Sequence, residues 1–160
     1  MDAAGFARQP GTDRWGIPMR DEHGTIIGIR IRRECGAKFA LVGSRSGLFL
    51  PNGPLQSNEP LAIVEGPTDL AATLGITRNA IGRPSCSGGQ ELLIRLVQFR
   101  KFKDIVLIPD NDAPGIEGAT RLKDALQPLG CLCRLLFLPP PYKDLREWVA
   151  QGKQFNLILT

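Results

Sequence analysis

The stretch IVLIPDND, residues 105–112, joins a continuous apolar run to two carboxylates, Asp110 and Asp112. An earlier stretch, LAIVEG (residues 61–66), has the same form and places Glu65 after its apolar run. Short apolar runs bounded by turn residues are typical of buried strands. Each acidic end leads into a helix-like segment, and strands that alternate with helices form parallel sheets covered on both faces. The two stretches therefore predict an α/β fold with three layers.

The three carboxylates follow strands that would end at the same edge of such a sheet. Ligands of open parallel sheets bind in the crevice beyond the carboxyl ends of the strands. If the two strands are neighbours, Glu65, Asp110 and Asp112 converge there and repel one another unless a proton or cation intervenes. A hard divalent ion such as Mg²⁺ prefers oxygen ligands and keeps several waters. The pattern favours metal-dependent phosphate chemistry, although Asp112 is also placed to cap the helix that follows it.

The rest of this region alternates between strand and helix patterns. Pro67 and Pro114 each stand in the first turn of a predicted helix, and Gly75 ends the first of these helices. The helix after Asp112 is amphipathic, because apolar residues recur at spacings of three and four. Those residues are Ile116, Ala119, Leu122 and Leu126. We expect further strands at residues 79–82 and 132–138, and helices at residues 67–74, 90–99 and 143–150.

The chain divides by composition into three parts. Residues 1–14 are expected to form a loose leader, and residues 15–58 a small β-rich segment. The stretch PNGPLQSN, residues 51–58, is rich in residues that interrupt regular structure and marks the end of that segment. Residues 59–160 then hold the alternating strands and helices.

A basic strand is the main feature of the β-rich segment. Along residues 25–33, one face holds Ile27, Ile29 and Ile31, and the other holds Gly28, Arg30 and Arg32. This period of two predicts a half-buried strand with basic groups on its open face, paired with residues 38–42. Residues 28–45 contain five cations and one acid, a difference that equals the whole net charge of +4. Such a run is either a solvated strand face or a surface for a polyanion.

Composition indicates a globular chain and excludes several classes. Of the 160 residues, 42% are hydrophobic and 22% are charged, which is typical of folded domains. The four cysteines form no C-x-x-C pair and there is one histidine, so a zinc site is not expected. With neither a signal-peptide pattern nor a long apolar run, we expect a soluble, cytoplasmic chain with no membrane partner.

Three acidic motifs follow one another along the chain. They are Glu65-Gly66-x-x-Asp69, Asp110-Asn111-Asp112-x-x-Gly115 and Lys143-Asp144. Over about residues 59–150 they resemble the Toprim domain, which DnaG-type primases share with topoisomerases and related nucleases. The resemblance implies that Glu65 is a general acid/base or a metal-site residue. It also implies that Asp110 and Asp112 hold Mg²⁺ or Mn²⁺.

The preceding β-rich segment indicates which branch of the Toprim proteins the chain resembles most. The stretches IPMRD (residues 17–21) and GTIIGIR (residues 24–30) are similar to the β segment before Toprim in DnaG-type primases. The acidic stretch DNDAPG (residues 110–115) is similar to the primase form of its motif. The resemblance implies a nucleotidyltransferase of DNA replication that uses a single-stranded DNA template and nucleotides. The residues implied to contact template phosphates are Arg30, Arg32 and Lys38. A helicase or further domains of a larger chain are implied as partners, and we expect incomplete activity without them.

Other residues near these motifs are candidates for supporting roles. Lys143 is a candidate phosphate contact, and Asp144 is a candidate helix cap or outer-sphere metal residue. Ser87 and Gly88 precede a predicted helix, whose N-terminal amides can hold phosphate, although tight-turn chemistry explains these residues equally well. Asp69 stands one turn into the first helix and is interpreted as a partner of the helix dipole or a cap.

Two other interpretations stay open at this point. One is a Toprim nuclease or a topoisomerase fragment, but the only tyrosine, Tyr142, lies in a proline-rich turn and is poorly placed as a nucleophile. The other is a non-catalytic module that binds nucleic acid. Metal-dependent product formation separates the enzymes from the binding module. Primer synthesis, as opposed to strand cleavage, separates a primase from a nuclease.

Overall fold

A parallel four-stranded sheet is the central element of the computed structural model, which describes residues 2–152. Its strands are β5 (Leu61–Glu65), β6 (Ala80–Arg83), β7 (Asp104–Ile108) and β8 (Leu132–Leu135). They lie in the order β6-β5-β7-β8, so β5 and β7 are neighbours, with Val64 opposite Ile108. The two strands that carry the acidic ends therefore finish side by side, as the sequence predicts.

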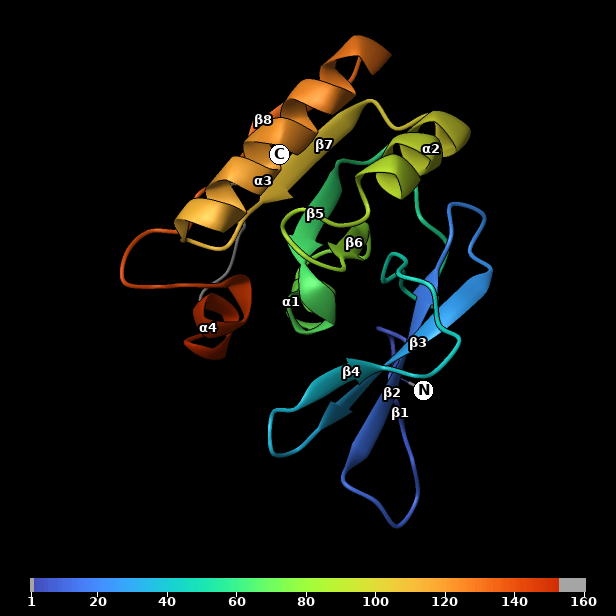
Figure 1. The fold of residues 1–160 in the computed structure, drawn as a ribbon. Helices are drawn as coiled ribbons and strands as arrows, with labels where there is room; N and C mark the ends of the chain where they lie inside the picture. Colours follow the sequence, from blue (N-terminus) through green and yellow to red (C-terminus); the bar gives the residue numbers. More distant parts are fainter. Residues whose placement is uncertain (1, 153–160) are drawn as a thin grey trace.

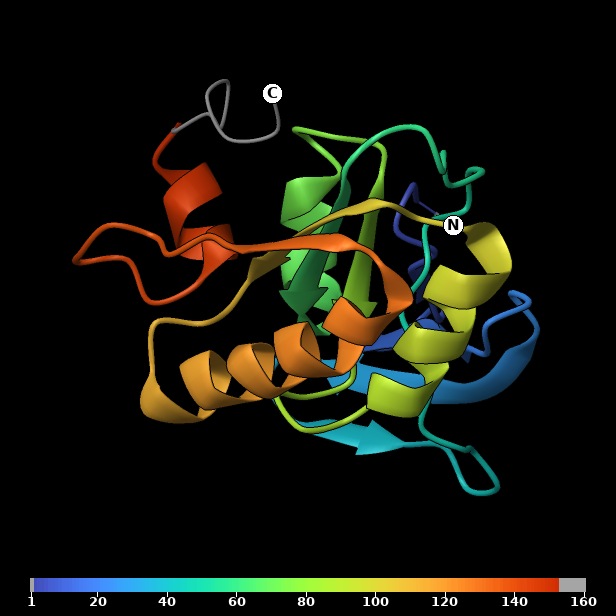
Figure 2. The same cartoon turned by 90° about the horizontal axis from the view of Figure 1, so that it is seen from above.

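Helices cover both faces of this sheet and complete three layers. They are α1 (Gly66–Thr73), α2 (Gln90–Arg100), α3 (Ala113–Leu126), the short 3-10 turn η1 (Gln127–Leu129) and α4 (Leu145–Ala150). Figures 1 and 2 show α2 and α3 on one face and α1 and α4 on the other. Because both faces are covered, β5, β6 and β7 are apolar except at their ends, where Glu65, Arg83 and Asp104 lie. The predicted three-layer α/β sandwich is confirmed. Among residues 2–152, no helix has the length and apolar character that crossing a membrane requires.

The buried stripe of α3 differs slightly from the predicted one. It runs through Gly115, Gly118, Leu122 and Leu126, and Ile116 lies beside it with 38% of its surface exposed. The glycines allow α3 to approach the loop after β6 closely. A Cβ atom on Gly118 would lie 2.1 Å from the carbonyl oxygen of Cys86, far inside van der Waals contact. Close backbone packing, and not side-chain size alone, therefore sets which face of α3 is buried.

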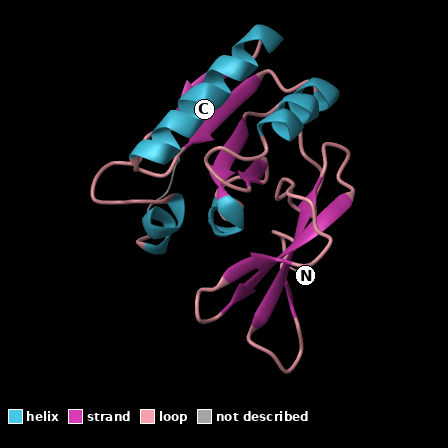
Figure 3. Cartoon of the chain, in the orientation of Figure 1, coloured by secondary structure: helices cyan, strands magenta, loops and turns pink. Residues whose placement is uncertain are grey.

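A second, antiparallel sheet precedes the parallel one and is drawn as the lower group of strands in Figure 3. Its strands are β1 (Ala7–Arg8), β2 (Arg14–Arg20), β3 (Ile26–Arg33) and β4 (Lys38–Ala40), in that order. β1 lies inside the predicted leader, and its two residues pair with Gly16 and Trp15 of β2. The described part of the predicted leader, residues 2–14, is thus tied to the sheet at this point, while the domain boundaries themselves stay a prediction.

The basic face of β3 points toward the parallel sheet, contrary to the prediction of an open face. The register places Ile17 of β2 opposite Arg30, so the two side chains share a face. Ile17 and Met19 are 1% exposed and join the core on the α1 side of the parallel sheet. Gly28 is buried between the side chain of Met19 and the backbone of Arg45. On this face β2 supplies the apolar side chains that contact the parallel sheet, and β3 supplies only Gly28. The arginines of β3 therefore lie beside that contact. The isoleucines on the other face of β3 stay half-buried.

The two sheets are joined by backbone hydrogen bonds through one short segment. Leu48 forms a bridge with Arg20 at the end of β2, and the next residue, Phe49, forms a bridge with Gly82 of β6. Both apolar side chains are essentially fully buried, and Phe49 lies under the guanidinium of Arg30, 5.7 Å from its ring centroid. This segment fixes the small sheet beside the carboxyl ends of β5 and β7.

Candidate active site

A cleft of about 400 Å³ lies between the small sheet and the carboxyl edge of the parallel sheet. Its acidic lining residues are Glu65, Asp69, Asp110, Asp144 and Glu147. Its basic lining residues are Arg30, Arg32, Lys38, Lys143 and Arg146. Seven of these ten residues are predicted site residues, and they meet because the small sheet carries its basic residues to the acidic edge.

Glu65 ends β5 and points into partly buried surroundings. One of its carboxylate oxygens, Oε1, is buried and has no hydrogen-bond partner among the described residues. Burial raises the pKa of Glu65 above its ordinary value, the charge of Asp110 raises it further, and the charge of Arg83 opposes both. A carboxylate with an unpaired buried oxygen and a raised pKa is suited to accept a cation or exchange a proton.

Asp110 ends β7 on the neighbouring strand. Its pKa rises to about 6, first because of burial and then because of the nearby charges of Asp144 and Asp112. A group with that pKa changes protonation near neutral pH and responds strongly to an added cation. Such shifts are typical of functional sites, where burial and like charges are placed together.

Asn111 holds the turn that follows Asp110. Its side-chain Nδ2 donates hydrogen bonds to the carbonyl oxygens of Leu138 and Tyr142, at 2.8 and 2.7 Å. Its backbone N–H donates to the carbonyl oxygen of Lys143 at 2.7 Å. The central residue of the Asp-Asn-Asp motif thereby fixes the loop after β8 against the acidic edge, and this loop carries Lys143 and Asp144 into the cleft.

Asp112 caps α3 and lies outside the cleft lining. Its Oδ1 accepts a hydrogen bond from the backbone N–H of Gly115 at 2.9 Å, which satisfies one of the free amides at the helix start. Its Oδ2 lies 3.8 Å from the Nζ of Lys143. Cap and metal ligand are compatible roles, since one oxygen is used at the cap and the side chain is 41% exposed.

Gly115 keeps a narrow space open between the acidic side chains. A Cβ atom at this position would lie 3.1 Å from Glu65 Oε1, 3.1 Å from Asp112 Oδ1 and 2.6 Å from the carbonyl oxygen of Asp110. Glu65 and Asp112 therefore face the same Cβ-sized space from opposite elements. Residue 115 has to be glycine for the three acidic positions to approach one another in this way.

The described residues fit a weakly held divalent ion better than a closed metal centre. Within residues 2–152, no three His, Cys, Asp or Glu side chains are grouped closely enough to enclose a metal ion. Mg²⁺ is commonly bound by one or two carboxylates and completes its shell with water and substrate phosphate. The unpaired Oε1 of Glu65 and the partly exposed carboxylate of Asp112 are oxygen donors suited to such an ion.

Asp144 and Arg146 lie at the start of α4. The sequence predicts a helix cap or an outer-sphere metal residue at Asp144 and assigns no role to Arg146. Asp144 caps α4 by accepting from the N–H of Glu147 at 2.8 Å, as predicted, and its Oδ2 accepts from Arg146 Nη2 at 3.0 Å. The N–H of Arg146 donates to Asp69 Oδ1 at 3.0 Å. Burial raises the pKa of Asp69 to about 7, while this hydrogen bond opposes the shift. Asp69 therefore joins α1 to α4 beside the cleft.

Arg83 is a buried cation that sequence analysis missed. It ends β6 directly opposite Glu65 and is only 3% exposed. Its guanidinium donates to the carbonyl oxygens of Cys86 at 2.6 Å and Gly118 at 3.4 Å. Burial lowers its pKa, and the charge of Glu65 raises it. The available signal was its position, since it follows the second strand at the same edge as the acids.

Ser87 and Gly88 lie away from the main cleft. The N–H of Gly88 donates to Ser85 Oγ at 2.9 Å, so this amide is already engaged within its own turn. Ser85 and Pro84 line the cleft from this loop, and Ser87 lines a separate hollow with Arg45. The tight-turn interpretation accounts for the observed contacts of Gly88.

Comparisons with known proteins agree with this architecture. Among solved structures, the primase fragment of the bacteriophage T7 primase-helicase protein matches 92% of this chain, with 21% identity and a TM-score of 0.67. The DnaG catalytic core matches 94% of this chain, with 22% identity and a TM-score of 0.64. The zinc-binding and RNA polymerase domains of Aquifex aeolicus primase match 93%, with 21% identity and a TM-score of 0.66. At these identities the likeness concerns the fold.

The match covers only part of each of those structures. The chain spans 61% of the T7 fragment, 54% of the DnaG core and 41% of the Aquifex aeolicus protein. A comparison with curated proteins finds no significant match. The family model described as Toprim-like matches residues 62–149, which include the acidic edge and all four helices almost to the end of α4. The chain therefore belongs to the Toprim-like family.

Proposed function

We propose that this chain is the Toprim catalytic module of a DnaG-like DNA primase, which transfers nucleotides on a single-stranded DNA template. One observation carries the proposal: the cleft that holds Glu65 and Asp110 is lined on its other side by Arg30, Arg32 and Lys38. Carboxylates and cations on facing walls suit a reaction in which a metal–phosphate centre works beside a polyanionic strand. The fold likeness to primase domains is consistent with this assignment.

The residues at the acidic edge of the cleft are assigned to metal binding, proton transfer and phosphate contact. Asp110 and Asp112 would hold Mg²⁺ or Mn²⁺, which neutralises phosphate charge when bound. Glu65, with its raised pKa and unpaired oxygen, would complete the ion's ligands or exchange a proton with the attacking hydroxyl. Lys143, which lines the cleft, would contact an incoming phosphate, and Asp144 would act through its cap and its contact with Arg146.

A near-isosteric change at Glu65 tests the catalytic assignment. Glu65→Gln should keep single-stranded DNA affinity and lose most Mg²⁺- or Mn²⁺-dependent nucleotide incorporation, because general acid–base groups typically contribute about 10²–10⁴-fold. Extension of a labelled primer is the measurement. Glu91→Gln, at an exposed position of α2, is the matched control. Incorporation by Glu65→Gln at the parent rate would leave Glu65 as a structural residue only.

The basic wall is tested by its salt dependence. Neutralising Arg30, Arg32 and Lys38 together to glutamine should weaken single-stranded DNA binding and lower the slope of log K against log salt by about 0.7 per lost phosphate contact. A control triple removes the same charge from exposed sites elsewhere, namely Arg78, Arg100 and Lys101. Equal salt slopes for the two triples would show that the cleft cations are only a solvated face.

A non-catalytic nucleic-acid-binding module is the second candidate. It is favoured by the absence of a closed three-acid group among residues 2–152 and by the pairing of Arg146 with Asp144. A parent chain that binds single-stranded DNA but shows no metal-dependent synthesis or cleavage would support it. Strand cleavage without synthesis would instead support a Toprim nuclease. Tyr142 packs edge-on against Trp148, with ring centroids 4.9 Å apart, which does not favour a topoisomerase nucleophile.

The proposal extends to the partners, the second substrate and the cellular location of the module. Because the chain spans 41–61% of the solved primase structures described above, complete primer synthesis is proposed to need further domains or a helicase partner. Nucleotides are the proposed second substrate, and the cytoplasm is the proposed place of action.

A further inference from the structure

A row of four side chains crosses the whole small sheet at one level. Arg8 of β1 lies opposite Trp15 of β2, Trp15 opposite Arg32 of β3, and Arg32 opposite Lys38 of β4. Directly opposed residues of antiparallel strands share a face. Since Arg32 and Lys38 line the cleft, the row lies on the cleft side of the sheet. With strands about 4.8 Å apart, three intervals extend the row over about 14 Å.

Trp15 is the unexpected member of this row. The next two residues of the same face of β2, Ile17 and Met19, are 1% exposed and enter the core, whereas Trp15 stays partly exposed. Arg8 lies over its indole ring, 5.9 Å from the centroid. An aromatic ring set among three cations is the arrangement by which proteins bind single strands, since bases stack on the ring and cations track the phosphates.

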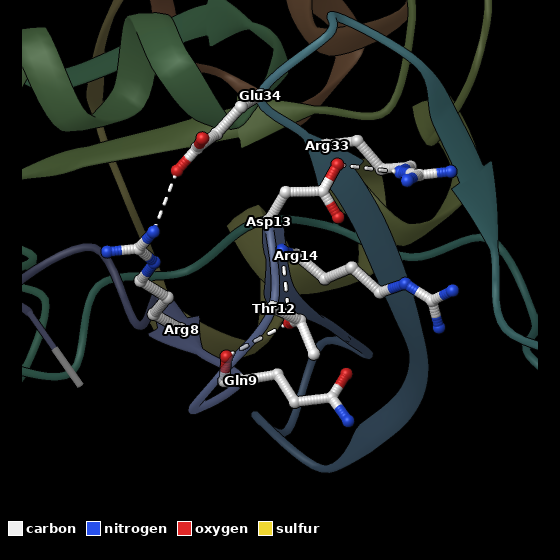
Figure 4. A network of polar contacts seen from close by, with 7 residues as sticks. All are labelled: Arg8, Gln9, Thr12, Asp13, Arg14, Arg33 and Glu34. Carbon is white, nitrogen blue, oxygen red and sulfur yellow. Dashed lines mark hydrogen bonds and ion pairs between the residues drawn. The ribbon is translucent and has the colours of Figure 1, made fainter.

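Arg8 is available for such a contact. It pairs with Glu34 at 2.8 Å, but both side chains are more than half exposed, and exposed pairs of this kind contribute little. Figure 4 shows this pair beside a second one, Asp13 with Arg33, which ties the β1–β2 turn to the end of β3. The backbone N–H of Glu34 also donates to the carbonyl oxygen of Asp13 at 3.1 Å, and this main-chain bond keeps the end of the sheet in place if Arg8 exchanges Glu34 for a phosphate.

We propose that Trp15 stacks on an unpaired base of single-stranded DNA while Arg8, Arg32 and Lys38 contact the flanking phosphates. This inference rests on the proposed function, in which the cleft binds a template strand, and it extends the strand's path from the cleft to the outer edge at β1. The site takes single strands in preference to duplex, because the faces of paired bases are already stacked on their neighbours.

Tryptophan fluorescence reports this contact directly. The chain has two tryptophans, so a Trp148→Phe variant leaves Trp15 as the only source of tryptophan emission. Titration with oligothymidylate should quench its emission, and a duplex of equal length should quench it far less. In the parent background, Trp15→Leu should weaken oligothymidylate binding by roughly 5- to 150-fold, measured by fluorescence anisotropy of the labelled strand. Trp15→Phe should keep most of the affinity, because its ring can still stack on a base, and a parent-like thermal unfolding transition of Trp15→Leu would show that its loss of binding is not misfolding.

The neighbouring charges supply matched controls. Arg8→Gln should lower the salt slope of binding by about 0.7, whereas Arg14→Gln, an exposed arginine on the opposite face of β2, should leave it unchanged. Glu34→Gln should strengthen binding by releasing Arg8. Parent-level binding by Trp15→Leu, with no quenching of Trp15, would overturn this inference and leave the proposed function standing. A parent chain that binds no single-stranded DNA would overturn both.

Discussion

Replacing Asp110 by asparagine should stabilise the metal-free fold at neutral pH. The pKa of Asp110 rises to about 6 from its ordinary 3.8, mainly because of burial and then because of Asp144 and Asp112. The folded state thus holds this proton more tightly than the unfolded chain does, so stability is lost as the pH rises from about 4 through about 6. At about 1.4 kcal/mol per pKa unit the full shift approaches about 3 kcal/mol, and solvent screening leaves roughly 1–3 kcal/mol.

Thermal and urea unfolding without divalent ions measure this effect. At pH 7.5, Asp110→Asn should melt roughly 3–10 °C above the parent, and the difference should vanish near pH 4. Asp124→Asn, an exposed change of the same charge on α3, should show no such gain. Added Mg²⁺ or Mn²⁺ should stabilise the parent and leave Asp110→Asn almost unaffected. An Asp110→Asn protein less stable than the parent at pH 7.5 would show that the charge is not penalised, and the reasoning would be refuted.

Three further changes test the supports of the site. Gly115→Ala should cost about 1–3 kcal/mol in urea unfolding and reduce Mn²⁺ binding, because its Cβ would lie 2.6 Å from the carbonyl oxygen of Asp110. Asp69→Asn should flatten the fall in stability between about pH 4 and pH 7, since the folded-state pKa of Asp69 is raised to about 7 and an amide oxygen can still accept from Arg146. Leu122→Ala should cost about 2–5 kcal/mol at a fully buried position of α3, without changing the salt dependence of DNA binding.

The sequence predicts the parallel sheet well because local patterns decide it. Apolar runs too short for helices, separated by amphipathic segments, leave few alternatives to strands with helical crossovers. The acids after β5 and β7 then meet because their strands are neighbours, with Val64 opposite Ile108. The cap at Asp112 is also a local feature, since a short polar side chain before Pro114 satisfies a free helix amide.

Features that depend on packing between segments were out of reach. Alternation along β3 gives two faces but does not say which is covered, and the buried contacts come from Ile17 and Met19 of another strand. The position of Arg83 after the predicted second strand puts it at the acidic edge, but its burial opposite Glu65 depends on the register of β5 and β6, which no local pattern encodes. Likewise, Arg146 approaches the acids only because a loop fixed by distant hydrogen bonds carries α4 to the cleft.

The backbone hydrogen bonds of Leu48 and Phe49 join the two sheets, so they set the width of the cleft between them. Leu48 exchanges two hydrogen bonds with Arg20 at 2.7 and 2.8 Å, and Phe49 exchanges two with Gly82 at 2.9 Å each. The amides of Leu48, Phe49 and Gly82 should therefore exchange with solvent deuterium only when both sheets open together, as one cooperative unit. Swinging the small sheet away as a rigid flap would break the two hydrogen bonds between Phe49 and Gly82. Adaptation to strands of different shape falls instead to long, flexible side chains such as that of Lys38.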